Sequence, residues 1–235
     1  MIRSIICIFY SAFWCFLAVV TLFFFPKSSD FVLRQYAQRF WSKPMLKWLI
    51  GASITVEISN KSQELFDSNK GAILMANHSS SLDITACFVA SPTPIVFLAK
   101  ASIRKIPFLG SANARVGTVF VERGNQQSTL KAISTLVKTV KDGRSVVVYP
   151  EGTRSKDGNI QPFKKGGFHL AVQAEAPIIT VYIGGTHKRL PSSDFSIKRF
   201  KDPIIVRFGD PIWSNNVKDL RTKTYNTICE LRDKN

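Results

Sequence analysis

Hydrophobic and polar positions divide the chain into an apolar beginning and a longer remainder with a different pattern. The 22 residues from Ser4 to Phe25 carry no charge and are rich in Ile, Phe, Val and Leu. An apolar run of this length can cross a bilayer as a helix. The next segment, Phe31 to Ile50, mixes bulky apolar side chains with Arg and Lys and contains Pro44. This mixture predicts an interfacial helix that breaks or kinks at the proline.

After residue 50 the pattern becomes an α/β alternation. Short apolar runs predict strands at 54–58, 72–76, 95–98, 118–121, 145–149, 178–183 and 204–208. Helices are predicted at 82–90, 126–141, 166–174 and 217–232, and Gly and Pro clusters predict loops at 107–117, 150–167 and 184–191. Apolar strands that alternate with helices indicate an α/β fold, and we expect a mixed, largely parallel central sheet covered by helices on both faces.

This pattern also predicts how the chain is divided. Residues 1–50 are expected to form N-terminal membrane-associated helices, and residues 51–235 the α/β domain. A cleaved signal peptide fits poorly, because the apolar stretch is too long and no small-x-small site precedes Pro26. Whether the first helix spans the bilayer or enters one leaflet is left open by hydropathy.

The charge balance points to a polyanionic partner. The chain has 32 basic and 16 acidic residues, a net charge of +16. Nucleic acid, an anionic phospholipid membrane and a phosphorylated substrate are the candidates. We expect no nucleic acid partner, because the sequence has no nucleic-acid-binding signature. Basic residues follow the apolar segment and predict, for a spanning helix, that the body of the protein lies on the cytoplasmic side of the membrane: Lys27, Arg34, Arg39, Lys43 and Lys47.

Metal and disulfide chemistry find little support in the sequence. The four cysteines have no regular spacing and are expected to be buried small hydrophobes in a reducing compartment. The three histidines, His78, His169 and His187, form no ligand motif with them. We therefore expect no metal site.

The strongest candidate for catalysis is the stretch Asn77-His78-Ser79-Ser80-Ser81-Leu82-Asp83. It joins a predicted buried strand to a predicted helix, which puts His78 in the turn and Asp83 in the first helical turn. A carboxylate on one ring nitrogen fixes the tautomer and prepares the other nitrogen to accept a proton from a hydroxyl group. The alternative is that His78 only ends a strand and that the serines cap the helix.

Further basic and glycine-containing segments follow other predicted strands. Lys100 ends one strand, and Gly117 to Arg123 contains another. The strand at 145–149 leads into a turn whose Gly152 allows close backbone approach, whose Thr153 can donate to an oxyanion and whose Arg154 suits phosphate; the turn is Tyr149-Pro150-Glu151-Gly152-Thr153-Arg154-Ser155. These loops predict a phosphate site, with solvated basic loops as the alternative.

Taken in order, these segments resemble the four blocks of the glycerolipid acyltransferase family. The blocks are Asn77-His78-x4-Asp83, Gly117 to Arg123, Tyr149 to Ser155 and the strand that begins at Ala176-Pro177, and they span roughly residues 70 to 185. More narrowly, they resemble the bacterial 1-acylglycerol-3-phosphate (lysophosphatidic acid) acyltransferases. The resemblance implies a glycerol-3-phosphate acyltransferase-like fold.

The resemblance implies a reaction. His78 would be the general base that deprotonates the sn-2 hydroxyl of lysophosphatidic acid, and Asp83 would orient His78. The oxygen would attack the acyl thioester directly, with acyl-CoA or acyl carrier protein as co-substrate, and phosphatidic acid would form without an acyl-enzyme. No cofactor is implied.

The resemblance also implies an acceptor-binding set: Lys100, Gly117, Arg123, Glu151, Gly152 and Arg154, to which the residue chemistry adds Thr153. Arg154 is the expected phosphate ligand. The chain departs from the bacterial pattern at Lys100-Ala101-Ser102-Ile103, where those members usually have Lys-x-Glu-Leu, and at Glu122, where Asp is common.

Other functions stay open at this point. A related acyltransferase would use glycerol-3-phosphate, a lysophospholipid or an ornithine lipid as acceptor. A serine hydrolase would use one of Ser79 to Ser81 with His78, although no Gly-x-Ser-x-Gly elbow is present. A non-catalytic module would bind anionic lipid through its basic face.

Overall fold

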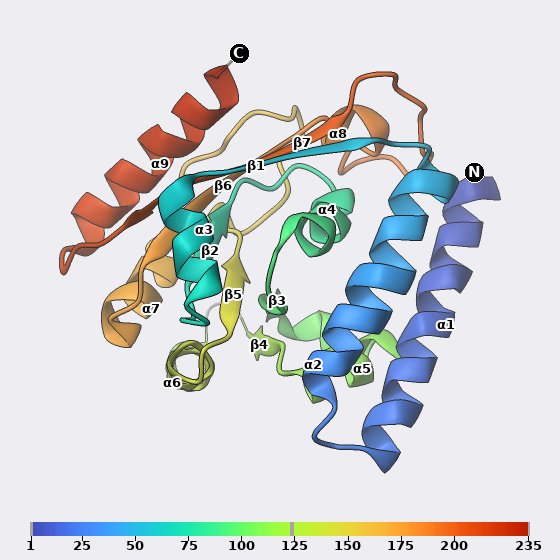
Figure 1. Ribbon diagram of the computed structural model, residues 1–235, viewed down its shortest axis with the longest axis horizontal. Coiled ribbons are helices and arrows are strands. Elements are labelled where there is room, and N and C mark those ends of the chain that lie inside the picture. The colour runs from blue at the N-terminus through green and yellow to red at the C-terminus, as the bar shows by residue number, and fades with distance from the viewer. Residues whose placement is uncertain (1, 123–124, 235) are drawn as a thin grey trace.

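A seven-stranded sheet forms the centre of the computed structural model, which describes residues 2–122 and 125–234 (Figure 1). Its strands are β1 (Ile54–Ile58), β2 (Ile73–Ala76), β3 (Ile95–Lys100), β4 (Val119–Val121), β5 (Ser145–Val148), β6 (Ile178–Gly184) and β7 (Ile204–Ile212). The order is β1-β7-β6-β2-β5-β3-β4, and only the β6–β7 pair is antiparallel. The predicted mixed, largely parallel sheet is confirmed.

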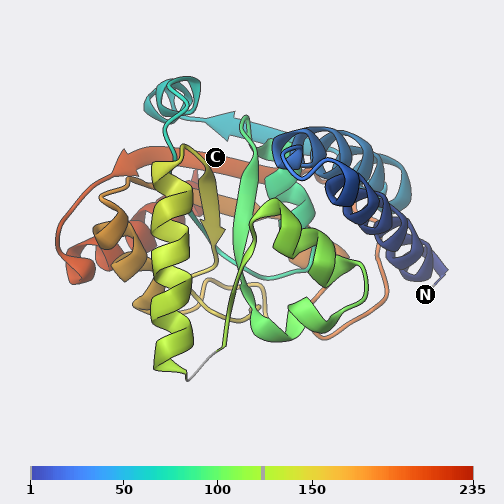
Figure 2. The ribbon, with the colours of Figure 1, turned by 90° about the horizontal axis from the view of Figure 1, so that it is seen from below.

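Helices cover both faces of this sheet, as expected. On one face lie α6 (Gln126–Lys141), α7 (Gly166–Ala174) and α9 (Val217–Asp233); on the other lie α4 (Leu82–Ala90) and the N-terminal helices (Figures 1 and 2). Shorter helical segments complete the chain: α3 (Asn60–Asp67), the 3₁₀ turn η3 (Ala101–Lys105), α5 (Leu109–Val116) and α8 (Thr186–Arg189).

Alternate residues of the central strands fill two cores. In β2, Ile73 and Met75 pack with residues of α6, α7 and α9, whereas Leu74 and Ala76 pack with residues of α4. All four are buried, so the strand is apolar throughout rather than alternating. This arrangement fixes the carboxyl end of β2, which leads directly into the histidine turn.

The predicted strands agree with the observed ones except at their ends, and three predicted helices have the same bounds as α4, α6 and α7. Three short helices, α3, α5 and α8, were not predicted. α3 begins at an Ser59 cap, whose side chain accepts from Ser62 N–H, and α5 lies within the predicted 107–117 loop. α3 and α5 each have eight residues, too few for a clear apolar period, and α5 contains Gly110. The predicted 184–191 loop contains α8.

The N-terminal segment forms two long helices that lie side by side (Figures 1 and 2). α1 (Ile2–Phe24) is, within the described residues, the helix that is long and apolar enough to cross a membrane by length and composition. The second helix runs through α2 (Ser29–Phe31) and two stretches with wider i→i+5 turns, η1 (Val32–Ser42) and η2 (Met45–Ile50). Pro44 has helical φ −66° and ψ −37°, so the helix does not break there, whereas the alternative of a kink stays a prediction.

Candidate active site

His78 and Asp83 form the centre of the site. His78 lies in the turn after β2, and Asp83 lies in the first turn of α4. His78 Nδ1 is 2.8 Å from Asp83 Oδ2. The Asp83 side chain is completely buried, whereas that of His78 is 15% exposed. The turn therefore lets two residues five positions apart meet, with the imidazole at the protein surface.

Asp83 is surrounded by hydrogen-bond donors. The backbone N–H groups of Ser79 and Ser80 donate to Oδ2 at 2.7 and 2.9 Å, and the hydroxyl of Thr186 donates to Oδ1 at 2.5 Å. A carboxylate is an acceptor only, so Nδ1 of His78 supplies one more proton to it. In the neutral imidazole Nε2 then has a free lone pair and can act as a base.

The loop after β5 holds the histidine from the other side. The rings of His78 and Tyr149 stack with centroids 3.9 Å apart and planes 14° apart. The backbone N–H of Ser155 donates to the His78 carbonyl at 2.8 Å. Because β2 and β5 are parallel neighbours, their carboxyl ends bring these two loops together.

Glu151 joins the histidine turn to the loop after β5. Its carboxylate is 2% exposed and accepts from the backbone N–H of His78 at 2.7 Å and that of Gln161 at 3.2 Å. Burial raises the pKa of Glu151 to about 7, against the opposing effect of these two donors. Both carboxylate oxygens of Glu151 thus accept from backbone N–H groups, and its contact with the acceptor stays a prediction.

Basic side chains flank the histidine turn. Arg154 is exposed, and its Nη1 donates to Ser81 Oγ at 2.6 Å. Gly152 has φ +72°, and a Cβ there would lie 3.1 Å from Lys164 Nζ, so glycine permits the lysine side chain to cross the turn. Thr153 is exposed on the same loop. Arg154, Thr153 and Lys164 thus offer cations and a hydroxyl beside His78.

The other predicted binding residues are divided between two edges of the sheet. Lys100 ends β3 at the carboxyl edge that also carries the histidine turn, and it is exposed. Gly117 precedes β4 at the opposite edge, where it ends α5 with φ +102° and a Cβ would meet Arg144 Nη1 at 3.4 Å. The structure therefore does not bring Gly117 to the site. Arg123 lies outside the described residues.

The serines beside His78 are committed to other contacts. Ser79 Oγ lies 3.4 Å from Thr186 Oγ1, and Ser80 Oγ donates to the Leu190 carbonyl at 2.7 Å. Ser79 and Ser80 are buried, and Ser81 Oγ accepts from Arg154. This arrangement does not resemble the serine–histidine pair of a hydrolase, in which the imidazole accepts from the nucleophilic hydroxyl.

Two further residues of the site, Thr186 and Tyr149, have no role that the sequence pattern predicts. Thr186 follows Gly184-Gly185 at the carboxyl end of β6, which pairs with β2 in parallel. The sequence signal for Thr186 is that a polar residue follows a strand whose parallel neighbour leads to the histidine turn. Of the other histidines, His169 is exposed on α7, whereas His187 Nδ1 lies 3.4 Å from the Ser79 carbonyl.

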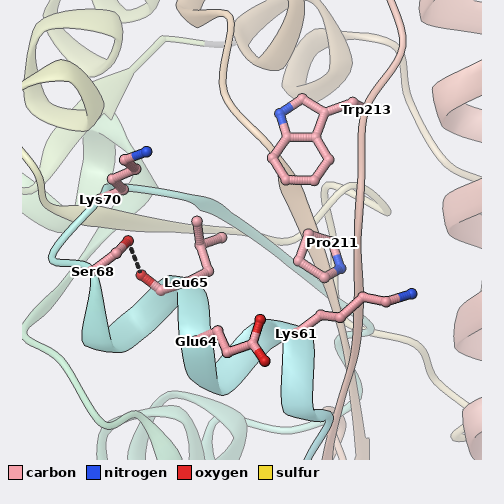
Figure 3. A pocket seen from close by; sticks show the side chains of 7 residues that line it. All are labelled: Lys61, Glu64, Leu65, Ser68, Lys70, Pro211 and Trp213. Atoms are coloured by element: carbon pink, nitrogen blue, oxygen red, sulfur yellow. Dashed lines mark hydrogen bonds between the residues drawn. The ribbon is translucent and has the colours of Figure 1, made fainter.

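Two cavities lie at the opposite edge of the sheet. The first has a volume of about 330 Å³. Figure 3 shows its lining, where Leu65 of α3 lies near Pro211 and Trp213. The second, about 500 Å³, shares Trp213 and Lys70 and extends to Gly71 and Pro177, which precede β2 and β6. Neither borders His78 or Asp83, so we assign the site by its chemical groups rather than by cavity volume.

Sequence relatives have a consistent name. The chain is 31% identical over 182 residues to the 1-acyl-sn-glycerol-3-phosphate acyltransferase of Cocos nucifera. The aligned region covers 77% of this chain and 56% of the relative. It is 36% identical over 151 residues to the enzyme of the same name from Saccharomyces cerevisiae, an alignment that covers 63% of this chain and 49% of the relative. It is 32% identical over 140 residues to that from Borreliella burgdorferi, an alignment that covers 60% of this chain and 54% of the relative. The chain spans about half the length of these curated relatives.

A solved structure has the same fold. The crystal structure of the 1-acyl-sn-glycerophosphate (LPA) acyltransferase PlsC from Thermotoga maritima matches with a TM-score of 0.65, covering 99% of this chain and 98% of that chain at 23% identity. The family profile described as Acyltransferase matches residues 53–184, which contain every strand of the sheet except β7 and both members of the His78–Asp83 pair. The chain therefore belongs to the acyltransferase family.

Proposed function

We propose that this protein transfers an acyl group from an acyl thioester to the sn-2 hydroxyl of 1-acylglycerol-3-phosphate and so forms phosphatidic acid. The observation that carries the proposal is the His78–Asp83 pair, in which a buried, fully bonded carboxylate orients a partly exposed imidazole. The names of the relatives support this choice of acceptor and product.

In the proposed reaction His78 Nε2 removes the proton from the acceptor hydroxyl as its oxygen attacks the thioester carbonyl. Asp83 stabilises the imidazolium that forms. The tetrahedral intermediate then breaks its carbon–sulfur bond, and the imidazolium returns the proton to the leaving thiolate. General-base catalysis of this kind contributes roughly 10²–10⁴-fold. The thiolate is a good leaving group, so the proposal needs no metal or other cofactor.

The acceptor phosphate is proposed to bind at the basic loops beside His78. Arg154 is the main candidate because its planar donor fork suits phosphate oxygens, and Lys164 adds a cation over Gly152. Lys100 lies at the same sheet edge. A phosphate held there would orient the glycerol hydroxyl toward the imidazole, and such positioning lowers the entropic barrier to the reaction.

The membrane is proposed as the place of the reaction, because acceptor and product are lipids. Residues 1–50 are the proposed membrane-associated segment, since α1 exposes apolar side chains such as Phe9 (71%) and Phe24 (68%). The basic residues that follow α1 favour a cytoplasmic position for the α/β domain, facing anionic lipid. Acyl-CoA or acyl carrier protein would reach the site from that side.

An acceptor and donor panel tests the proposal. Purified full-length protein would be incubated with labelled acyl-CoA or acyl carrier protein thioester and with each acceptor in turn. We expect lysophosphatidic acid to be favoured and phosphatidic acid to form, and His78→Ala to remove that product. Preference for glycerol-3-phosphate, a lysophospholipid or an ornithine lipid would replace the proposed acceptor. Covalent labelling of Ser79, Ser80 or Ser81 by a fluorophosphonate would favour a hydrolase instead.

A further inference from the structure

The loop from Leu190 to Pro203, between α8 and β7, presents an unusual apolar side chain. Phe195 is 82% exposed, more than any other large apolar side chain in the described part of the chain. Phe200 in the same loop is 40% exposed. An aromatic ring held this far into solvent gains free energy when a partner covers it.

The loop is ordered by a buried cation. Arg189 is 1% exposed, and its guanidinium donates to the carbonyls of Gly185 at 3.1 Å, Phe200 at 3.0 Å and Asp202. The backbone N–H of Lys198 donates to the Arg189 carbonyl at 2.8 Å. These bonds close the base of the loop, so Phe195 is presented by a fixed scaffold.

The tip of the loop adjoins the beginning of α1. The Ser4 hydroxyl donates to the Phe195 carbonyl, and both ribbon views place the loop beside the start of α1 (Figures 1 and 2). The first turns of α1 expose Ile2 (76%) and Ile5 (48%). Phe195 therefore extends the apolar surface of the proposed membrane-associated segment.

Basic side chains of the same loop and an exposed tryptophan lie near this apolar surface. Lys198, Arg199 and Lys201 follow Phe195 in the loop. A Cβ on Gly51, which ends η2, would lie 3.7 Å from Arg199 Nε, so the loop also adjoins the helix end that carries Trp48, 71% exposed. Aromatic rings with Lys and Arg beside them are typical of the boundary between water and lipid.

The base of the loop contacts the histidine turn. Ser80 Oγ donates to the Leu190 carbonyl at 2.7 Å, and Ser80 N–H donates to Asp83. A surface that binds lipid through this loop is thus connected by two hydrogen bonds to the catalytic carboxylate. Membrane contact here would hold His78 at a fixed height relative to lipid headgroups.

We propose that the loop 190–203 is a membrane-contacting element in addition to the N-terminal helices, with Phe195 inserted at the headgroup boundary of an anionic bilayer and Arg199 and Lys201 at phosphate level. This inference rests on the membrane location in the proposed function and gives that location a specific surface. A bilayer fits better than an acidic protein, because the exposed apolar side chains continue from the loop onto α1.

The test uses a fluorescent reporter at the tip of the loop. Full-length Phe195→Cys protein, labelled with nitrobenzoxadiazole, would be reconstituted into vesicles of phosphatidylcholine with about one-third phosphatidylglycerol. The native cysteines are buried or half-buried, and the unsubstituted chain treated in parallel gives their background. Leu130→Cys on α6 is the matched control, because Leu130 is an exposed apolar residue (56%) on the opposite face of the sheet.

We expect the label at 195 to shift to the blue and to be quenched at least about threefold more by nitroxide-labelled lipid than the label at 130. Equal quenching at 195 and 130 on vesicle-bound protein would overturn the inference. An emission change that requires acyl carrier protein, without lipid quenching, would overturn it in favour of a protein partner. The readout does not use acyl transfer, so its failure is distinguishable from failure of the proposed reaction.

Discussion

The hydroxyl of Thr186 donates to Asp83 Oδ1 at 2.5 Å, although the two residues lie 103 positions apart in the chain. Both are completely buried. The contact forms because β6, which leads to Thr186, pairs in parallel with β2, which leads to the histidine turn. Thr186 therefore bonds Oδ1 of Asp83, whereas Oδ2 accepts from His78 and from the N–H groups of Ser79 and Ser80. In the proposed mechanism the threonine is a positioning residue.

Replacing Thr186 by valine removes this hydroxyl at nearly constant shape. We expect Thr186→Val to lower kcat about tenfold with little change in KM, because the carboxylate is less firmly oriented. Thr186→Ser should restore most of the rate. Thr180→Val on β6 is the control, since Thr180 Oγ1 is buried with no hydrogen-bond partner in the described structure. A Thr186→Val enzyme as fast as wild type would contradict this role.

Much of the site follows from the sequence, and the remainder depends on the sheet. His78 and Asp83 are close in sequence, and the strand–turn–helix pattern was enough to predict that their side chains meet. Thr186 reaches Asp83, and Tyr149 reaches His78, through the order of the strands, which local patterns do not contain. Gly117 shows the reverse case: it belongs to a recognisable block, yet the direction of β4 puts it at the far edge.

Tyr149 should position the imidazole through its ring and not through its hydroxyl. The stacked pair of Tyr149 and His78 has a centroid separation of 3.9 Å, and the tyrosine hydroxyl reaches Cys87 Sγ at 3.7 Å. We expect Tyr149→Phe to keep a rate near wild type and Tyr149→Leu to lower kcat about tenfold, the scale of an aromatic contact. Steady-state kinetics on both variants checks this, and equal rates for the two would contradict it.

Glu151 should make stability depend on pH. Burial raises the pKa of Glu151 from 4.5 to about 7. Between these pH values the folded protein keeps a proton that the unfolded chain has released. The free energy of unfolding therefore gains at most about 3 kcal/mol from Glu151 below about pH 4.5, and this gain is lost as pH rises toward 7. Glu151→Gln should remove that slope.

The measurement is the free energy of unfolding of the detergent-solubilised protein at pH 4.5, 5.5 and 7. Glu64→Gln, which changes an exposed carboxylate on α3, is the control and should keep the wild-type slope. Parallel slopes for wild type and Glu151→Gln would show that the buried carboxylate does not titrate in this range.

Arg154 should act mainly on acceptor binding. Its guanidinium is exposed beside His78, where it donates to Ser81 Oγ at 2.6 Å. We expect Arg154→Ala to raise KM for lysophosphatidic acid about tenfold with a smaller effect on kcat, because a charge-assisted contact to phosphate is lost. Lys138→Ala on α6 removes the same charge from an exposed position away from the site and should leave KM unchanged. An unchanged KM in Arg154→Ala would place the phosphate elsewhere.

The sheet and the long helices could be predicted more completely than the short helices. Apolar strands such as β2, buried over all four residues, have no other stable setting than the middle of a covered sheet. Pro44 does not break the second helix, although a proline lacks the N–H that a helix interior normally uses; wide i→i+5 turns lie on both sides of it. α3 and α5 depend on packing more than on an apolar period, so their sequences resemble loops.

The most direct test of general-base catalysis is kcat for wild type and His78→Ala, measured together with lysophosphatidic acid binding at equilibrium. Because the proposed role of the imidazole is to remove a proton and not to hold the phosphate, we predict a fall in kcat of at least about 100-fold with Kd changed by less than about threefold. Asp83→Asn should also lower kcat. A folded His78→Ala protein that keeps kcat within tenfold of wild type would contradict the account.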